Sequence, residues 1–241
     1  MVLYRDDAVV LRTYKLAEAD RIVVAFSRGR GKIRAVAKGV RRTRSKFGSR
    51  LEPGSIVQLQ LYEGRNLDIV TQAERLHNLT DLRADLQSYG RAALLLEIID
   101  AAMAESEPNA AMYKLLTGAL QELDREGNPL VVPTFVAKLL VLEGVQPLVD
   151  ACVRCGTEAN LVAIQIAEGG VTCRDHRAGQ PISDGARMAL EQVFQGQVRH
   201  VLDTTPPEVA QELETLAARL IEQHIERPLR SSAVLYEQLQ D

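Results

Sequence analysis

Up to residue 79, apolar and polar positions alternate with the two-residue period that is typical of β-strands. Strand-like patterns cover Tyr4–Tyr14, Ile22–Ser27, Gly31–Lys38, Ile56–Tyr62 and Leu67–Glu74. In the third segment, the alternation places Ile33 and Ala35 on one face and Lys32 and Arg34 on the other. Five short strands in so short a stretch predict a small β-barrel.

From Thr80 onward the apolar positions recur with helical spacing instead. The first run comprises Leu82, Leu86, Tyr89, Ala93, Leu96 and Met103; a second follows Pro108, and a third follows Pro133. Helical patterns resume at Ser183–Phe194 and at Val209–Leu220. We therefore expect an α+β multidomain protein, with a barrel domain at residues 1–79 and a helical bundle domain at residues 80–241 that carries an insertion at residues 148–180.

The insertion contains a motif of paired metal ligands. Cys152-Val-Arg-Cys155 is followed, after seventeen residues, by Cys173-Arg-Asp-His176. Thiolate and imidazole are the ligands that a structural zinc site prefers, and two pairs at this separation can close a tetrahedron around one ion. The motif uses all three cysteines of the chain, which predicts one Zn²⁺ held by Cys152, Cys155, Cys173 and His176.

A strand at Leu161–Ala167, a turn at Glu168-Gly169-Gly170 and a short return strand at Val171-Thr172 would form a zinc-ribbon hairpin. We expect a structural rather than a catalytic zinc ion, because four protein ligands leave no open position. The chain lacks the Pro-Cys and His-x-Glu elements of a nucleobase deaminase. Reduced cysteines are typical of a cytosolic protein.

The charge is divided between the two predicted domains. Residues 1–79 hold 16 Lys/Arg against 8 Asp/Glu, whereas residues 80–241 hold 13 against 24. The stretch Arg21–Leu51 contains eleven basic residues and no acidic one. A solvated surface usually mixes both signs, so this run favours a polyanionic partner, most often nucleic acid.

The basic run lies on the third predicted strand and on the loop that follows it. An OB-fold, a five-stranded barrel, presents its second and third strands to oligonucleotides, so charge and geometry agree. The predicted DNA-binding residues are Arg30, Lys32, Arg34, Lys38, Arg41, Arg42, Arg44, Lys46, Phe47 and Arg50. Phe47 is a candidate for base stacking, although it could equally plug one end of the barrel, and Tyr62 is a second candidate.

Motifs of enzymatic chemistry are missing from the sequence. It contains no Walker-type Gly-Lys-Ser/Thr loop, no dinucleotide-binding glycine turn and no Gly-x-Ser-x-Gly elbow. We therefore predict a protein without catalytic residues. No apolar run has the roughly 20 residues of a membrane helix, and the first residues lack a signal-peptide pattern, so we expect a cytoplasmic, nucleoid-associated protein.

At this point the chain resembles a known family. A basic barrel containing Gly31-Lys32-Ile33-Arg34-Ala35-Val36-Ala37-Lys38-Gly39-Val40-Arg41-Arg42, then helices interrupted by Cys-x-x-Cys and Cys-x-x-His, resembles the bacterial recombination mediator RecO over essentially its whole length. The resemblance implies DNA repair without enzymatic turnover. It implies binding of single- and double-stranded DNA, strand annealing, and cooperation with RecR to load RecA on DNA coated by single-stranded-DNA-binding protein (SSB). His176 stands where that family often has Cys.

Alternatives to this interpretation remain open at the level of sequence. Charge does not separate RNA from DNA, so an RNA-binding or ribosome-associated factor with the same barrel and ribbon is the competing hypothesis. The ribbon itself could contact DNA through Arg154, Arg174 and Arg177, although Glu158, Glu168 and Asp175 offset their charge. The acidic helical domain is better suited to protein partners, such as the tail of SSB, than to DNA.

Overall fold

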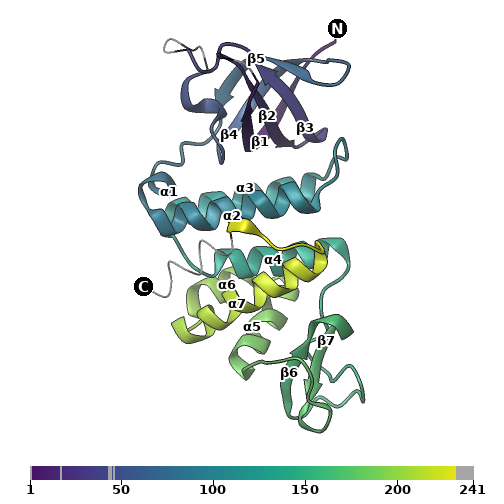
Figure 1. Ribbon diagram of the computed structural model, residues 1–241. Helices are drawn as coiled ribbons and strands as arrows, with labels where there is room; N and C mark the ends of the chain where they lie inside the picture. The colour runs from purple at the N-terminus through teal and green to yellow at the C-terminus, as the bar shows by residue number, and fades with distance from the viewer. Residues whose placement is uncertain (1, 17, 43–44, 46, 232–241) are drawn as a thin grey trace. The chain divides into compact units, whose positions relative to one another are not determined.

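The structure of the chain is a computed structural model, which describes all residues except 1, 17, 43–44, 46 and 232–241 (Figure 1). The chain forms two compact units, Met1–Gly127 (unit 1) and Asn128–Ser232 (unit 2). The first three helices thus group with the barrel. The compact units do not test the predicted division into domains at residues 1–79 and 80–241, which stays a prediction.

The five predicted strands are all present in unit 1. They are β1 (Leu3–Lys15), β2 (Arg21–Ser27), β3 (Gly31–Ala37), β4 (Ile56–Tyr62) and β5 (Asp68–Arg75), in a closed barrel of order β1-β2-β3-β5-β4. A short 3₁₀ helix, η1 (Gly48–Leu51), lies between β3 and β4. The barrel closes by a short parallel pairing of β3 with β5, at Ala35↔Asp68 and Val36↔Ile69.

The interior of the barrel is filled by the faces that the alternation predicted. Ile33, Ala35 and Ala37 of β3 point inward and are buried, while Arg34 between them is exposed. Val57, Leu59 and Leu61 of β4 are buried in the same cluster. The two-residue period and the burial of one face are the physical reason why β3 and β4 were predictable.

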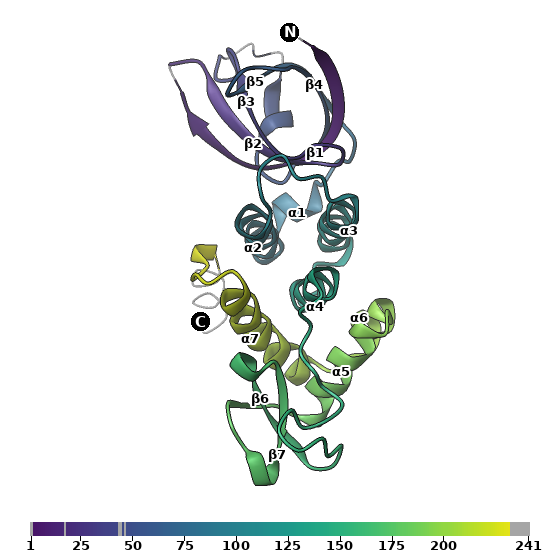
Figure 2. The same cartoon turned by 90° about the vertical axis from the view of Figure 1, so that its right-hand side faces the viewer.

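The outside of the barrel is also buried along β1 and β2. Val9, Leu11, Val24 and Phe26 point away from the interior cluster, yet all are nearly inaccessible to solvent. Below the barrel lie α2 (Leu86–Ala102) and α3 (Ala110–Glu126), after the single turn of α1 (Asp81–Ala84) (Figure 1). The two long helices contact each other and lie side by side in Figure 2. Contacts of both long helices with β1 account for this second buried layer.

The helices of unit 2 include α4 (Val131–Glu143), α5 (Asp184–Phe194), α6 (Val198–Thr204) and α7 (Pro207–His224). Helix α4 packs against both α5 and α7. The pattern analysis missed α6, a helix of seven residues with Val201 as its one buried residue, because it is too short to show a period. Helix α4 begins two residues before Pro133, where a missing backbone N–H breaks no helical hydrogen bond.

The ribbon, residues 148–180, belongs to unit 2. Strands β6 (Leu161–Gln165) and β7 (Gly170–Cys173) form the predicted hairpin, and a two-residue strand, β8 (Gln180–Pro181), pairs with the other edge of β6. The 3₁₀ turns η2 (Ile166–Glu168) and η3 (Arg174–His176) follow the two long strands. Over the part of the chain that the structure describes, no helix has the length and apolar character needed to span a membrane.

Candidate metal centre and nucleic-acid interface

The four predicted metal ligands converge in the ribbon. The ligand atoms of Cys152, Cys155, Cys173 and His176 all lie within 4.8 Å of one another. The Sγ atoms of Cys155 and Cys173 are 3.8 Å apart, and Cys173 Sγ lies 3.4 Å from His176 Nδ1. Zinc–ligand bonds of about 2.3 Å to sulfur and 2.0 Å to nitrogen give tetrahedral edges of roughly these lengths. The spacing of the donor atoms therefore fits a single ion.

Local backbone geometry brings the two pairs together. After the first pair the chain turns at Gly156, whose φ of 75° favours glycine, and the turn is closed by Cys152 N–H donating to Thr157 O at 2.8 Å. Cys173 ends β7, directly opposite Leu161 of β6. The next turn, η3, brings His176 back toward Cys173. The hairpin thus supplies one pair and the glycine turn presents the other.

The thiols crowd one another. Burial opposes ionisation of Cys152, but hydrogen bonds from backbone N–H groups, that of Cys173 foremost, lower the pKa of its thiol to about 6. The N–H of Thr157 favours a Cys155 thiolate, yet burial and the neighbouring Cys152 and Cys173 raise the pKa of Cys155. A divalent cation would relieve this conflict, because it lets every thiol coordinate as a thiolate.

The predicted cationic surface is only partly built as expected. Arg34, Lys38, Arg41, Arg42 and Arg50 are exposed on β3, the following loop and η1. Arg44 and Lys46 lie outside the described residues. The side chains of Arg34, Lys38 and Arg42 form no hydrogen bond or ion pair among the described residues, whereas Arg41 donates from Nη1 to Glu18 O at 3.0 Å. Within the described part of the chain, Arg34, Lys38 and Arg42 can therefore approach a polyanion without breaking internal contacts.

Lys32 departs from the prediction. Its side chain is only 11% exposed, and its Nζ donates to the backbone O of Asp100 at 2.8 Å and lies 3.7 Å from the Asp100 carboxylate. The same carboxylate accepts from Arg12 Nε at 2.5 Å. Lys32 therefore ties β3 to α2 rather than facing solvent, because the helices cover that part of the outer face of β3.

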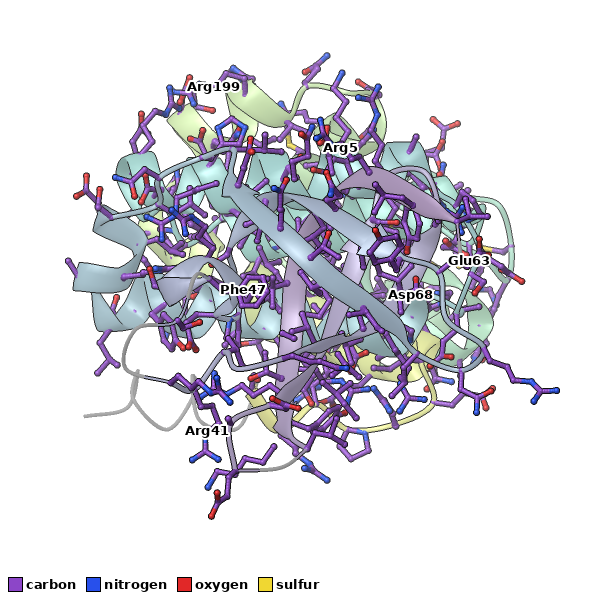
Figure 3. All side chains as sticks on the ribbon, turned by 90° about the horizontal axis from the view of Figure 1, so that it is seen from above. Arg5, Arg41, Phe47, Glu63, Asp68 and Arg199 are labelled. Carbon is purple, nitrogen blue, oxygen red and sulfur yellow. The ribbon has the colours of Figure 1, made fainter. Side chains whose placement is uncertain are left out.

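Phe47 takes the second of its two predicted roles. Its side chain is 1% exposed and belongs to the interior cluster of the barrel, within the ring of strands in Figure 3. A ring this deeply buried offers no face to a base, which corrects the prediction of Phe47 as a stacking residue. Tyr62, the other candidate, is 40% exposed.

The burial of the outer face of β2 also differs from the expectation for an OB-fold. The OB-fold analogy presents strands two and three to the oligonucleotide. Here Val24 and Phe26 of β2 are buried on the outer side, beneath the layer of helices. The surface left open for a nucleic acid comprises the exposed side of β3, the loops and the β4–β5 side of the barrel.

Sequence reasoning missed one cationic group outside the basic run. Arg65, in the β4–β5 loop, is exposed and lines a cavity together with Arg30 and Arg34. Arg30 lies over the ring of Tyr4, with its guanidinium carbon 3.9 Å from the ring centre. Its Nη1 atom lies 3.5 Å from Glu63 Oε1. These residues are far apart in the sequence, so only the closure of the barrel brings them together.

The order of these parts defines the class of the protein: a cationic OB-like barrel followed by helices, with a Cys₃His metal ribbon set among the helices. Comparison with known families identifies the particular family. Residues 1–79 match the family described as Recombination protein O N terminal, and residues 83–233 match Recombination protein O C terminal.

Individual relatives match this chain over most of its length. DNA repair protein RecO of Bifidobacterium longum strain DJO10A is 44% identical over 242 residues, 96% of this chain and 98% of that protein. DNA repair protein RecO of Frankia casuarinae is 39% identical over 238 residues, 96% and 97% of the two chains. That of Cutibacterium acnes is 46% identical over 181 residues, 72% and 74%. The chain belongs to the RecO family, which confirms the predicted resemblance and supports a role in DNA repair and recombination.

Proposed function

We propose that this chain is a non-enzymatic recombination mediator. It binds single- and double-stranded DNA, anneals complementary strands and, with RecR, helps to load RecA on single strands coated by SSB. The observation that carries the proposal is a set of exposed cations on β3 and the following loop, of which Arg34, Lys38 and Arg42 have no partner within the described ranges, in a chain of the RecO family. Family membership favours DNA over the competing RNA-binding hypothesis.

Annealing requires two polyanions to approach each other. Lys38 and Arg42 are exposed and have no side-chain partner among the residues that the structure describes, so they can neutralise phosphates while leaving base edges free to pair. Contacts of this kind are independent of sequence, which suits a protein that must act on any broken DNA. They also predict a strong dependence of affinity on salt.

The cluster of Cys152, Cys155, Cys173 and His176 is proposed to hold one structural Zn²⁺. The donor set is the one that zinc prefers, and all four positions of a tetrahedron are taken by protein atoms. A bound zinc ion would hold together a hairpin whose own core is small. The acidic helical part of the chain is the proposed site for protein partners, RecR and the SSB tail among them.

The decisive experiment is annealing of complementary oligonucleotides, bare or coated with SSB, by the chain and by its Arg41→Ala/Arg42→Ala/Arg44→Ala variant. We expect the chain to accelerate annealing on both substrates and the variant to lose most of this effect. A control is Lys114→Ala/Lys138→Ala, which removes two cations from α3 and α4, outside the basic run. Absence of acceleration by the unaltered chain on either substrate would contradict the proposal.

A further inference from the structure

A cavity of about 360 Å³ opens on the barrel where β3 and the β4–β5 loop diverge. Its lining comes from the β2–β3 turn and β3, from the β4–β5 loop, and from the α2–α3 loop, all within unit 1. The cavity lies where β3 pairs with β5 only at Ala35 and Val36, so the first half of β3, which pairs with β2 along its other edge, has no strand on its β5 side. The size is within the usual range of small-ligand pockets.

The walls of the cavity are held firmly. The backbone of Glu105, in the α2–α3 loop, forms an isolated parallel β-bridge with that of Lys32, and Ser106 N–H donates to Lys32 O at 3.1 Å. On the other side, Asp68 accepts from the N–H of Gly64 at 2.9 Å and from the hydroxyl of Tyr4. A Cβ atom at Gly31 would lie 2.1 Å from Glu107 O, so the α2–α3 loop packs directly against the start of β3.

The cavity offers a flat cationic surface. The guanidinium of Arg30 lies over the ring of Tyr4, and Arg30 lines the cavity whereas Tyr4 does not. The ion pair with Glu63 fixes the plane further. Guanidinium planes are platforms on which unpaired bases stack, and Arg30 is already held in the required orientation.

The remaining charges suit a nucleotide rather than a simple anion. Arg34 and Arg65 line the cavity and have no hydrogen bond or ion pair among the described residues, so both are available to a phosphate. Glu105, also in the lining, carries a carboxylate that would repel a phosphate but accept from the amino group of a base. Cations for a phosphate and an acceptor for a base therefore share one cavity.

We propose that this cavity binds one unstacked nucleotide of single-stranded DNA, with its base on the Arg30 plane and its phosphate on Arg34 and Arg65. A base within a duplex is stacked and paired, so the cavity selects single strands, whereas exposed cations such as Arg41 serve any DNA. Arg41 lies at a different edge of the barrel from Glu63 and Asp68 (Figure 3). The inference rests on the proposed function and adds to it a site that recognises the base.

The test compares fluorescence-anisotropy binding of an oligothymidylate with binding of its abasic analogue of the same length. We expect the unaltered chain to prefer the oligothymidylate by about 5- to 100-fold, because stacking on a protein side chain stabilises each bound base by about 1–3 kcal/mol. Arg30→Lys keeps the positive charge but removes the planar guanidinium, so the preference for oligothymidylate over the abasic analogue should be largely lost. Arg28→Lys, an equally conservative change in the same turn and outside the cavity lining, should leave the preference unchanged.

The outcomes separate this inference from the proposed function. Tight binding of both oligonucleotides with no preference for bases, or a preference that survives Arg30→Lys, overturns the nucleotide site and leaves DNA binding intact. Failure of the unaltered chain to bind either oligonucleotide overturns both. Thermal unfolding of Arg30→Lys checks that the substitution leaves the barrel folded.

Discussion

The ribbon and the cationic barrel differ in how their functional residues are assembled. In the ribbon, four ligands from two short motifs converge on one point, as their spacing predicted. On the barrel, residues of one basic run have different fates: Arg34 faces solvent, Lys32 is tied to α2, and Arg30 stacks on Tyr4. Ligand spacing defines a site locally, whereas the role of a charge depends on what the rest of the fold places beside it.

The largest expected effect concerns the metal. Cys173→Ser removes a ligand from the end of β7, and the chain should lose its zinc, measured as ions per chain by native mass spectrometry. Structural zinc binding in small domains is worth about 10–16 kcal/mol, so the ribbon should become sensitive to proteolysis. DNA affinity of the barrel should stay the same, which sharpens the contrast between the two regions.

A matched control for the metal prediction lies in the same turn. Asp175→Asn changes the charge between Cys173 and His176 without removing a ligand, and should retain the ion. Retention of stoichiometric zinc by Cys173→Ser would show that Cys173 is not needed as a ligand. Loss of DNA binding by Cys173→Ser with a folded barrel would favour the ribbon as the DNA contact.

The next effect tests the role of Phe47. Phe47→Ala should destabilise the protein by about 3–5 kcal/mol, because it opens a cavity in the interior of the barrel. Phe47→Leu, which keeps most of the apolar volume, should have a smaller effect. The measurement is urea unfolding followed by circular dichroism. A stable Phe47→Ala protein with much weaker binding of single strands would instead restore Phe47 as a stacking residue.

A somewhat smaller effect is expected at Asp100, which holds Lys32 and Arg12. Asp100→Ala leaves the buried ammonium of Lys32 without its carboxylate and should destabilise unit 1 by about 3 kcal/mol. Lys32→Met removes the charge and keeps the length of the side chain, so its effect should be smaller.

The neighbouring outward position on β3 supplies the control for Asp100. Arg34→Met removes an exposed cation and should change the free energy of unfolding by at most about 0.5 kcal/mol. Equal destabilisation by Lys32→Met and Arg34→Met would contradict the distinction between a structural and a solvent-facing cation.

Much of the fold could be predicted from the sequence, for physical reasons that differ between the elements. The strands β3 and β4 bury one face each, and the alternation revealed them. The burial of Val24 and Phe26 on the outer face of β2 was not predictable, because it depends on the tertiary packing of the barrel, beyond the reach of periodicity. A different limitation concealed α6 and the two-residue strand β8, because both elements are too short to show a periodic pattern.

The sites divide in the same way. The convergence of all four candidate metal ligands was predictable from spacing, since the pairs lie within single turns of the chain. The partner of Lys32 was beyond sequence reasoning, because Asp100 is 68 residues away. The Arg30–Tyr4 stack and the contribution of Arg65 likewise depend on barrel closure. Long-range packing decides which members of a charge run are available to DNA.

The smallest expected effect is on the salt dependence of DNA binding. Lys38→Ala/Arg42→Ala removes two exposed cations that have no partner among the described residues, so the fold should be unaffected. Each phosphate contact to a single strand contributes about 0.7 to the slope of log affinity against log salt concentration, so the slope should fall in magnitude by about 1.4. Lys114→Ala/Lys138→Ala removes the same charge elsewhere and should leave the slope as it was. Equal slopes in the two double variants would mean that net charge, not the loop after β3, attracts the DNA.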